Sequence, residues 1–106
     1  MAVVSVTTFT AKPDRFEDAV ADVRKVKAIF EKLGARNVRL LAALVAGEAT
    51  GSLAFVYEAD DFASQGALQD KFYADPEGMA LATSVNTTAG PLAGWYQGAL
   101  YVDVPL

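Results

Sequence analysis

The side chains most able to bind a ligand are one arginine and five aromatic residues, most of them on segments of strand-like composition. Arg39 interrupts the apolar run 38–46, where a full positive charge is costly to bury without a partner. It would bind an anionic ligand or, more simply, pair with Glu58 or lie exposed at a sheet edge. Aromatic side chains at alternating positions would stack a planar ligand, unless they only fill a core or an interface. The candidates for ligand binding are therefore Arg39, Phe55, Tyr57, Phe72, Trp95 and Tyr101.

Histidine and cysteine are absent from all 106 residues, and their absence removes several kinds of chemistry. Without cysteine there is no disulfide, thiolate nucleophile, iron–sulfur cluster or thiolate zinc site, and without histidine the commonest metal ligand and proton shuttle is missing. Acid–base catalysis would fall to a carboxylate of shifted pKa, a lysine, a tyrosine or bound water. We therefore expect no metal and no cofactor, and the sequence assigns no catalytic residue.

Acidic side chains outnumber basic ones, with 13 Asp and Glu against 9 Lys and Arg, for a formal net charge of −4. Binding to nucleic acid needs clustered Lys and Arg to neutralise phosphates, so this balance argues against such a partner. The N-terminal residues carry neither a basic segment nor a long apolar run, which predicts no signal peptide and no membrane span. We expect a cytoplasmic protein with no nucleic-acid or membrane partner.

Alternating strand and helix signals predict a single domain over residues 1–106 in the order β-α-β-β-α-β. Right-handed crossovers close this order as one four-stranded antiparallel sheet with both helices on the same face, the ferredoxin-like α+β fold. The strands are predicted at residues 2–10, 37–46, 52–59 and 95–104, with a hairpin loop at 47–51 and a second loop at 86–94.

The helices are predicted from their capping residues. Asp14, with Glu17 three residues later, forms an acidic capping box for a first helix that ends at Gly34. Asp60 or Asp61 caps a second helix over residues 62–73. Asp75, followed by proline at the first helical position, restarts the helix over residues 76–85. The break near Asp75 would suit a mobile pocket wall, on which Phe72 would lie.

The face of the sheet that points away from the helices is predicted to be partly apolar. Apolar residues, counted without glycine, make up 53% of the chain, which is high for so small a domain. The outward positions of a half-solvated antiparallel sheet are normally polar. Here they include Leu41, Val45, Val56, Trp95 and Tyr101. Leaving these side chains in water is unfavourable, so we expect this face to pack against a second copy in a homodimer.

The chain resembles the dimeric α+β barrel superfamily, in which two ferredoxin-like subunits pack sheet to sheet. The likeness spans essentially the whole chain and rests on a valine-rich first strand, the entry Lys12-Pro13-Asp14-Arg15-Phe16-Glu17, the break Asp75-Pro76-Glu77 and a closing strand led by Trp95-Tyr96. That superfamily includes antibiotic-biosynthesis-type monooxygenases, lactone isomerases, haem-dependent enzymes and stress-responsive barrels. The resemblance implies a pocket for a small apolar or aromatic molecule, between sheet and helices or between subunits.

The resemblance leaves two kinds of function open. The first is a cofactor-free monooxygenase or isomerase, in which the substrate supplies the reactive electrons or proton and the protein supplies desolvation and orientation. A tyrosine or Arg39 would then stabilise an enolate or phenolate. The second is a non-catalytic module that binds a metabolite or another protein. Haem is not expected, because its usual axial ligand is histidine.

Overall fold

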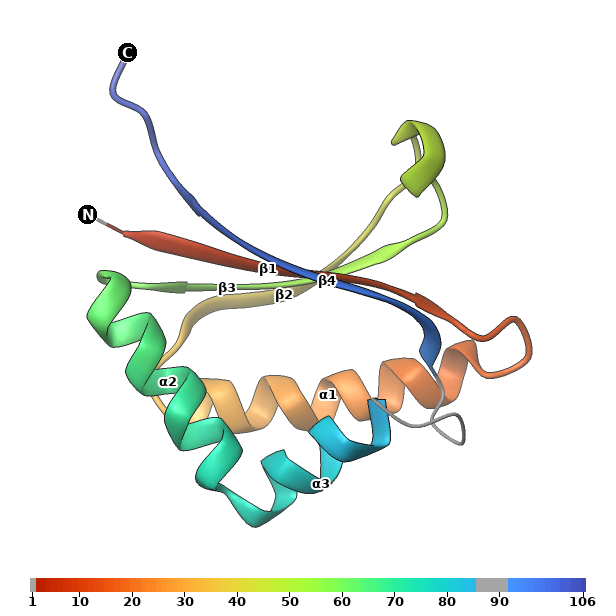
Figure 1. Ribbon diagram of the computed structural model, residues 1–106, viewed down its shortest axis with the longest axis horizontal. Helices are drawn as coiled ribbons and strands as arrows, with labels where there is room; N and C mark the ends of the chain where they lie inside the picture. Colours follow the sequence, from red (N-terminus) through yellow and green to blue (C-terminus); the bar gives the residue numbers. More distant parts are fainter. Residues whose placement is uncertain (1, 86–91) are drawn as a thin grey trace.

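One four-stranded antiparallel sheet, in the order β2-β3-β1-β4, carries α1, α2 and α3 on one of its faces (Figure 1). The computed structural model describes residues 2–85 and 92–106, with the backbone alone at 49, 84–85 and 92–96. Its elements are β1 (Val3–Ala11), α1 (Phe16–Lys32), β2 (Arg36–Ala42), the 3₁₀ turn η1 (Gly47–Ala49), β3 (Leu53–Ala59), α2 (Phe62–Ala74), α3 (Pro76–Val85) and β4 (Leu92–Val102). The predicted ferredoxin-like α+β fold is confirmed.

The register of the strands defines two faces of the sheet. Val6 on β1 lies opposite Val56 on β3, and Val56 in turn lies opposite Arg39 on β2. Antiparallel partners share a face and neighbours along a strand alternate between faces, so these pairings assign a face to the positions outside the irregularities of β1 and β2. The covered face, toward the helices, holds Phe9, Leu53, Phe55 and Tyr57. The open face, away from them, holds Val4, Val6, Arg39, Leu41, Ala54, Val56, Glu58 and Tyr101.

The start of α1 differs from the prediction, and its end agrees with it. Arg15 is the N-cap, and no side chain caps the helix, so the predicted role of Asp14 in a capping box is wrong. The backbone N–H of Arg15 instead donates to Lys12 O at 2.9 Å, closing a turn that delays the helix to Phe16. At the other end, Gly34 adopts a φ of 103°, a left-handed conformation that suits glycine and ends the helix.

The predicted caps of α2 and α3 are confirmed. Asp61 Oδ1 accepts a hydrogen bond from Ser64 N–H at 2.7 Å, which lowers the pKa of the Asp61 carboxyl. Asp75 Oδ1 accepts from the N–H groups of Glu77 at 2.9 Å and Gly78 at 3.0 Å. A Cβ at Gly78 would collide with the carbonyl oxygen of Phe72, so only glycine lets α3 pack this closely against the end of α2.

Strand ends differ from the prediction by a few residues. β2 ends at Ala42 rather than at residue 46, because the chain turns through η1 before returning to β3. The turn is closed by bonds from Ala43 N–H to Ser52 O at 2.9 Å and from Gly51 N–H to Ala43 O at 2.8 Å. β4 begins at Leu92, which pairs with Ala11 beyond an irregularity in β1, and ends at Val102. Residues 86–91 of the predicted loop lie outside the described residues.

Candidate functional site

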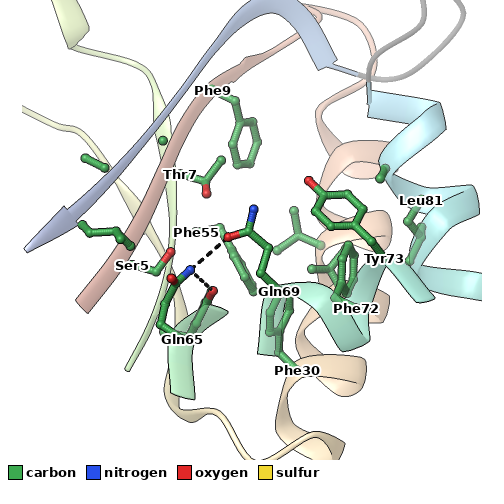
Figure 2. A pocket seen from close by; sticks show the side chains of 17 residues that line it. Ser5, Thr7, Phe9, Phe30, Phe55, Gln65, Gln69, Phe72, Tyr73 and Leu81 are labelled. Carbon is green, nitrogen blue, oxygen red and sulfur yellow. Dashed lines mark hydrogen bonds between the residues drawn. The ribbon is translucent and has the colours of Figure 1, made fainter. Parts of the chain in front are cut away.

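A pocket of about 400 Å³ lies between the covered face of the sheet and the helices (Figure 2). Strands β1, β3 and β4 form one side and α1, α2 and α3 form the other. Its lining residues are Ser5, Thr7, Phe9, Val23, Val26, Phe30, Phe55, Tyr57, Gln65, Gln69, Phe72, Tyr73, Leu81, Ala82, Gly98, Ala99 and Leu100. The volume and the mostly apolar lining are typical of a small-molecule site.

Stacked aromatic rings form one wall of the pocket. The ring of Phe30, on α1, lies 4.6 Å from that of Tyr57 on β3, at an interplanar angle of 24°. On its other side it lies 4.7 Å from the ring of Phe72 on α2, at 15°. Phe55 adds a tilted contact to Phe30 at 5.7 Å. All four residues are buried, so the wall is held by packing from three elements and presents flat apolar surface.

Two glutamines on α2 provide the polar part of the lining. Gln65 Nε2 donates to Tyr57 Oη at 3.1 Å and to Gln69 Oε1 at 3.1 Å (Figure 2). Gln65 and Gln69 are four residues apart, so they lie on the same side of the helix. Hydroxyl groups of Ser5 and Thr7 face the same space from β1 (Figure 2). The pocket therefore combines an aromatic wall with a small set of neutral polar groups.

Among the described residues that line the pocket, none is acidic, lysine or arginine. In this described lining the ionisable side chains are the phenols of Tyr57 and Tyr73, both of which can donate a hydrogen bond. In the described residues there is also no group of three or more acidic side chains able to hold a metal ion. The described lining therefore offers hydrogen bonds from neutral groups and an apolar surface.

The structure divides the six predicted ligand-binding residues between two faces. Phe55, Tyr57 and Phe72 line the pocket, whereas Arg39 and Tyr101 lie on the open face. Trp95 lies on β4, and its side chain is outside what the structure describes. Residues that the sequence reasoning missed are Phe30, Gln65 and Gln69. Gln65, an amide on the same side of α2 as Leu68 and Phe72, was the available signal, because a buried amide needs partners.

Arg39 pairs with Glu58 on the open face, as one of the two simpler interpretations predicted. Arg39 Nη1 lies 3.3 Å from Glu58 Oε2 and donates to the backbone oxygen of Asn37 at 2.8 Å. Asn37 Nδ2 donates to the same Glu58 oxygen at 2.7 Å. Asn37 has a φ of 52° at an irregularity of β2, which brings its side chain to this group. The charge of Arg39 is thus satisfied within the chain.

On the open face, apolar side chains are exposed on the two edge strands, β2 and β4, and a valine on the inner strand β3 is buried. Leu41 is 47% exposed and Tyr101 is 57% exposed, in agreement with the prediction of an apolar outward set. Val56 is only 1% exposed, so the expectation that it would be left in water is wrong. It lies on an inner strand, flanked in the register by Val6 and Arg39. Among the described strand residues of this face, Leu41 and Tyr101 are the exposed large apolar side chains.

No protein-family model and no curated protein matches the chain, but solved structures match it in fold. A NIPSNAP family protein from Agrobacterium tumefaciens has a TM-score of 0.75 and 10% identity, over 97% of this chain and 86% of that one. An uncharacterised NIPSNAP domain protein from Burkholderia xenovorans gives 0.72 and 16%, over 96% and 94%. A proposed antibiotic biosynthesis monooxygenase from Deinococcus radiodurans gives 0.71 and 10%, over 98% and 94%.

These neighbours are proteins of the dimeric α+β barrel superfamily, and at 10 to 16% identity the similarity establishes the fold. The resemblance inferred from the sequence is confirmed at that level. Of the helices in the described part of the chain, none combines the length and apolar character that crossing a membrane requires.

Proposed function

We propose that the chain is a homodimeric cytoplasmic protein that binds a small, uncharged, largely aromatic molecule in the pocket beneath its sheet. The observation that carries this proposal is the pocket itself, about 400 Å³ between stacked aromatic rings and two neutral glutamines. A flat ring gains contact area and favourable stacking against such a wall. The four aromatic residues of the wall are Phe30, Phe55, Tyr57 and Phe72.

The absence of charge from the described lining favours an uncharged ligand. A carboxylate or an ammonium group that leaves water needs a partner of opposite charge, and none of the lining residues that the structure describes carries one. Arg39, which the sequence left open as an anion-binding residue, lies on the opposite face and is paired with Glu58. We therefore propose Phe55, Tyr57 and Phe72 as ligand-contacting residues and assign Arg39 to structure.

The open face supports the proposed homodimer. The described helices all cover the other face (Figure 1), and Leu41 and Tyr101 remain about half exposed. Packing sheet against sheet would remove this apolar surface from water. The occupant that we propose is a second copy of the chain, because superfamily neighbours share this architecture across nearly their whole length.

Two roles for the bound molecule follow from the lining. A non-catalytic metabolite-binding protein needs only the pocket as described. A cofactor-free monooxygenase or isomerase needs in addition a group that stabilises the anion formed on the substrate, and among the described lining residues the phenols of Tyr57 and Tyr73 are the ionisable groups for that role. Since none of the described lining residues carries a carboxylate to take a proton, binding is the role that this lining supports best, and catalysis is the second candidate.

Native mass spectrometry of the protein purified from its own cells tests both parts of the proposal. The expected result is a mass near twice 11.2 kDa, plus a small uncharged molecule that is released on denaturation. Leu41→Asp should shift the protein to monomer, because it places a charge on the open face. Met79→Asp on α3 is the matched control, since Met79 is 49% exposed on the helical side. A monomeric wild-type protein, or equal dissociation by both variants, contradicts the dimer.

A further inference from the structure

The hydrogen bonds of Gln65 determine which polar groups of the pocket act as donors and which act as acceptors. Gln65 is 7% exposed, and its Nε2 donates at 3.1 Å to Tyr57 Oη and at 3.1 Å to Gln69 Oε1. The nitrogen of a primary amide has two hydrogens, so these two bonds use both of them. Toward Tyr57 and Gln69, the amide nitrogen of Gln65 thus acts as a donor.

The two residues that accept hydrogen bonds from Gln65, Tyr57 and Gln69, each keep a hydrogen-bond donor that Gln65 does not use. Tyr57 Oη has accepted a hydrogen bond from Gln65 and keeps its own hydrogen to donate. Gln69 turns its carbonyl oxygen to Gln65, and its Nε2 extends away from Gln65 into the space between Thr7 and Tyr73 (Figure 2). Hydroxyl groups such as those of Ser5 and Thr7 donate and accept alike, so they adapt to either kind of ligand.

We infer that Gln65 is a positioning residue that makes the pocket select ligands with a hydrogen-bond acceptor, such as a carbonyl oxygen, over ligands with only a donor. This inference rests on the proposed ligand-binding function and specifies its ligand class. A ligand acceptor placed between Tyr57 and Gln69 meets two donors. A ligand donor placed there faces the hydrogens of Tyr57 and Gln69. It loses its hydrogen bonds to water and forms none in their place, which is unfavourable.

Three bicyclic probes of similar size separate the polarity of the ligand from its hydrophobicity. 1-Indanone carries an acceptor only, indole carries an N–H donor, and indane carries neither. Their dissociation constants are measured from chemical-shift changes of the isotope-labelled full chain. We expect 1-indanone to bind about tenfold more tightly than indole, the ratio that about 1.4 kcal/mol of hydrogen bonding produces.

Two substitutions change the polarity of the pocket at nearly constant shape. In Gln65→Glu the carboxylate only accepts, so Tyr57 and Gln69 donate to it and the Gln69 carbonyl oxygen turns to the cavity. In Gln69→Glu the carboxylate still accepts from Gln65, but the donor in the cavity is lost. Gln69 is exposed, so this second variant tests the inference even if the buried carboxylate of the first variant prevents folding. Ala63→Glu, on the exposed side of α2, adds the same charge away from the pocket.

The inference is supported if 1-indanone is preferred by the wild type and by Ala63→Glu, and if Gln69→Glu, together with Gln65→Glu where that variant folds, reduces the preference at least threefold. A preference for indole in the wild type, equal binding of 1-indanone and indole, or an unchanged preference in Gln69→Glu each overturns it, while the proposed pocket stands. If 1-indanone, indole and indane all fail to bind, the proposed ligand-binding function fails and this inference fails with it.

Discussion

The two faces of the same sheet are built from the same alternating strands, yet they differ in what completes them. On the covered face, Phe55 and Tyr57 pack against the ring of Phe30 on α1, which also stacks on Phe72 of α2, and a pocket lies beside these rings. On the open face, the equivalent central positions hold Val56 and the Arg39–Glu58 pair, with apolar side chains exposed on either side. The chain's own helices cover one face, whereas on the other face the central Val56 is buried and Leu41 and Tyr101 stay exposed.

This difference separates folding from assembly. Side chains of the covered face pack against elements of the same chain, so a substitution there changes the free energy of unfolding at any protein concentration. Exposed side chains of the open face contribute little to folding, and under the proposed dimer they contribute to association instead. The dependence of stability on protein concentration is therefore the measurement that distinguishes the two faces.

The largest effect is expected from Phe30→Ala, which removes the middle ring of the stack on the covered face. Loss of a buried phenylalanine costs about 3–5 kcal/mol, because the cavity that remains is only partly refilled. Urea unfolding at micromolar and at submicromolar concentration should show the same loss. Tyr101→Ala is the comparison on the open face, and its loss should appear only at the higher concentration. Losses that depend on concentration in the same way for both variants would refute the separation.

An intermediate effect is expected at the corner that joins the two helices beside the pocket. Gly78→Ala forces α3 away from the Phe72 carbonyl oxygen and should destabilise the protein by about 1–3 kcal/mol, as overpacking does. Gly66→Ala on α2 is the control, since a Cβ there meets nothing within 4 Å. It should stabilise the helix by up to about 1 kcal/mol. Thermal melting of both variants checks the opposite signs, and destabilisation of similar size by both would contradict this account of the corner.

The smallest effect is expected from the pH dependence of the cap of α2, the helix that carries both glutamines. The bond from Ser64 N–H lowers the pKa of Asp61 below its usual 3.8, so its contribution to stability is present above that pH and is lost as pH falls through the lowered value. Asp61→Asn keeps an acceptor without this titration. The stability difference between wild type and variant should be constant near neutral pH and change only below about pH 4. A change confined to neutral pH would contradict the assignment.

The sequence predicted the fold because its main signals are local. Glycine at position 34 and aspartates at positions 61 and 75 each mark a helix end through backbone bonds that their own neighbours supply. The failure at Asp14 is local as well: Arg15 closed a turn with Lys12, and the helix began without a side-chain cap. The periodicity of apolar residues does not show which of two adjacent polar residues, here Asp14 and Arg15, is the N-cap of the helix.

The site was only partly predictable, because a pocket depends on which elements meet. Phe55 and Tyr57 alternate on one strand and were correctly placed on a common face. Phe30 was predicted only as part of a helix, since nothing in its own segment shows that it stacks between a strand and another helix. Val56 was wrongly left in water because its burial depends on the strand at each side, and strand register is not visible in the sequence.

The Arg39–Glu58 pair has a consequence for assembly that follows from symmetry. If two identical chains meet through the open face, a two-fold axis passes through the interface and every side chain occurs there twice. A change at either residue then acts at two equivalent places, so its free-energy effect per dimer doubles and the dissociation constant changes as the square. For a heterodimer of one altered and one native chain, the free energy of dissociation would lie midway between those of the two homodimers.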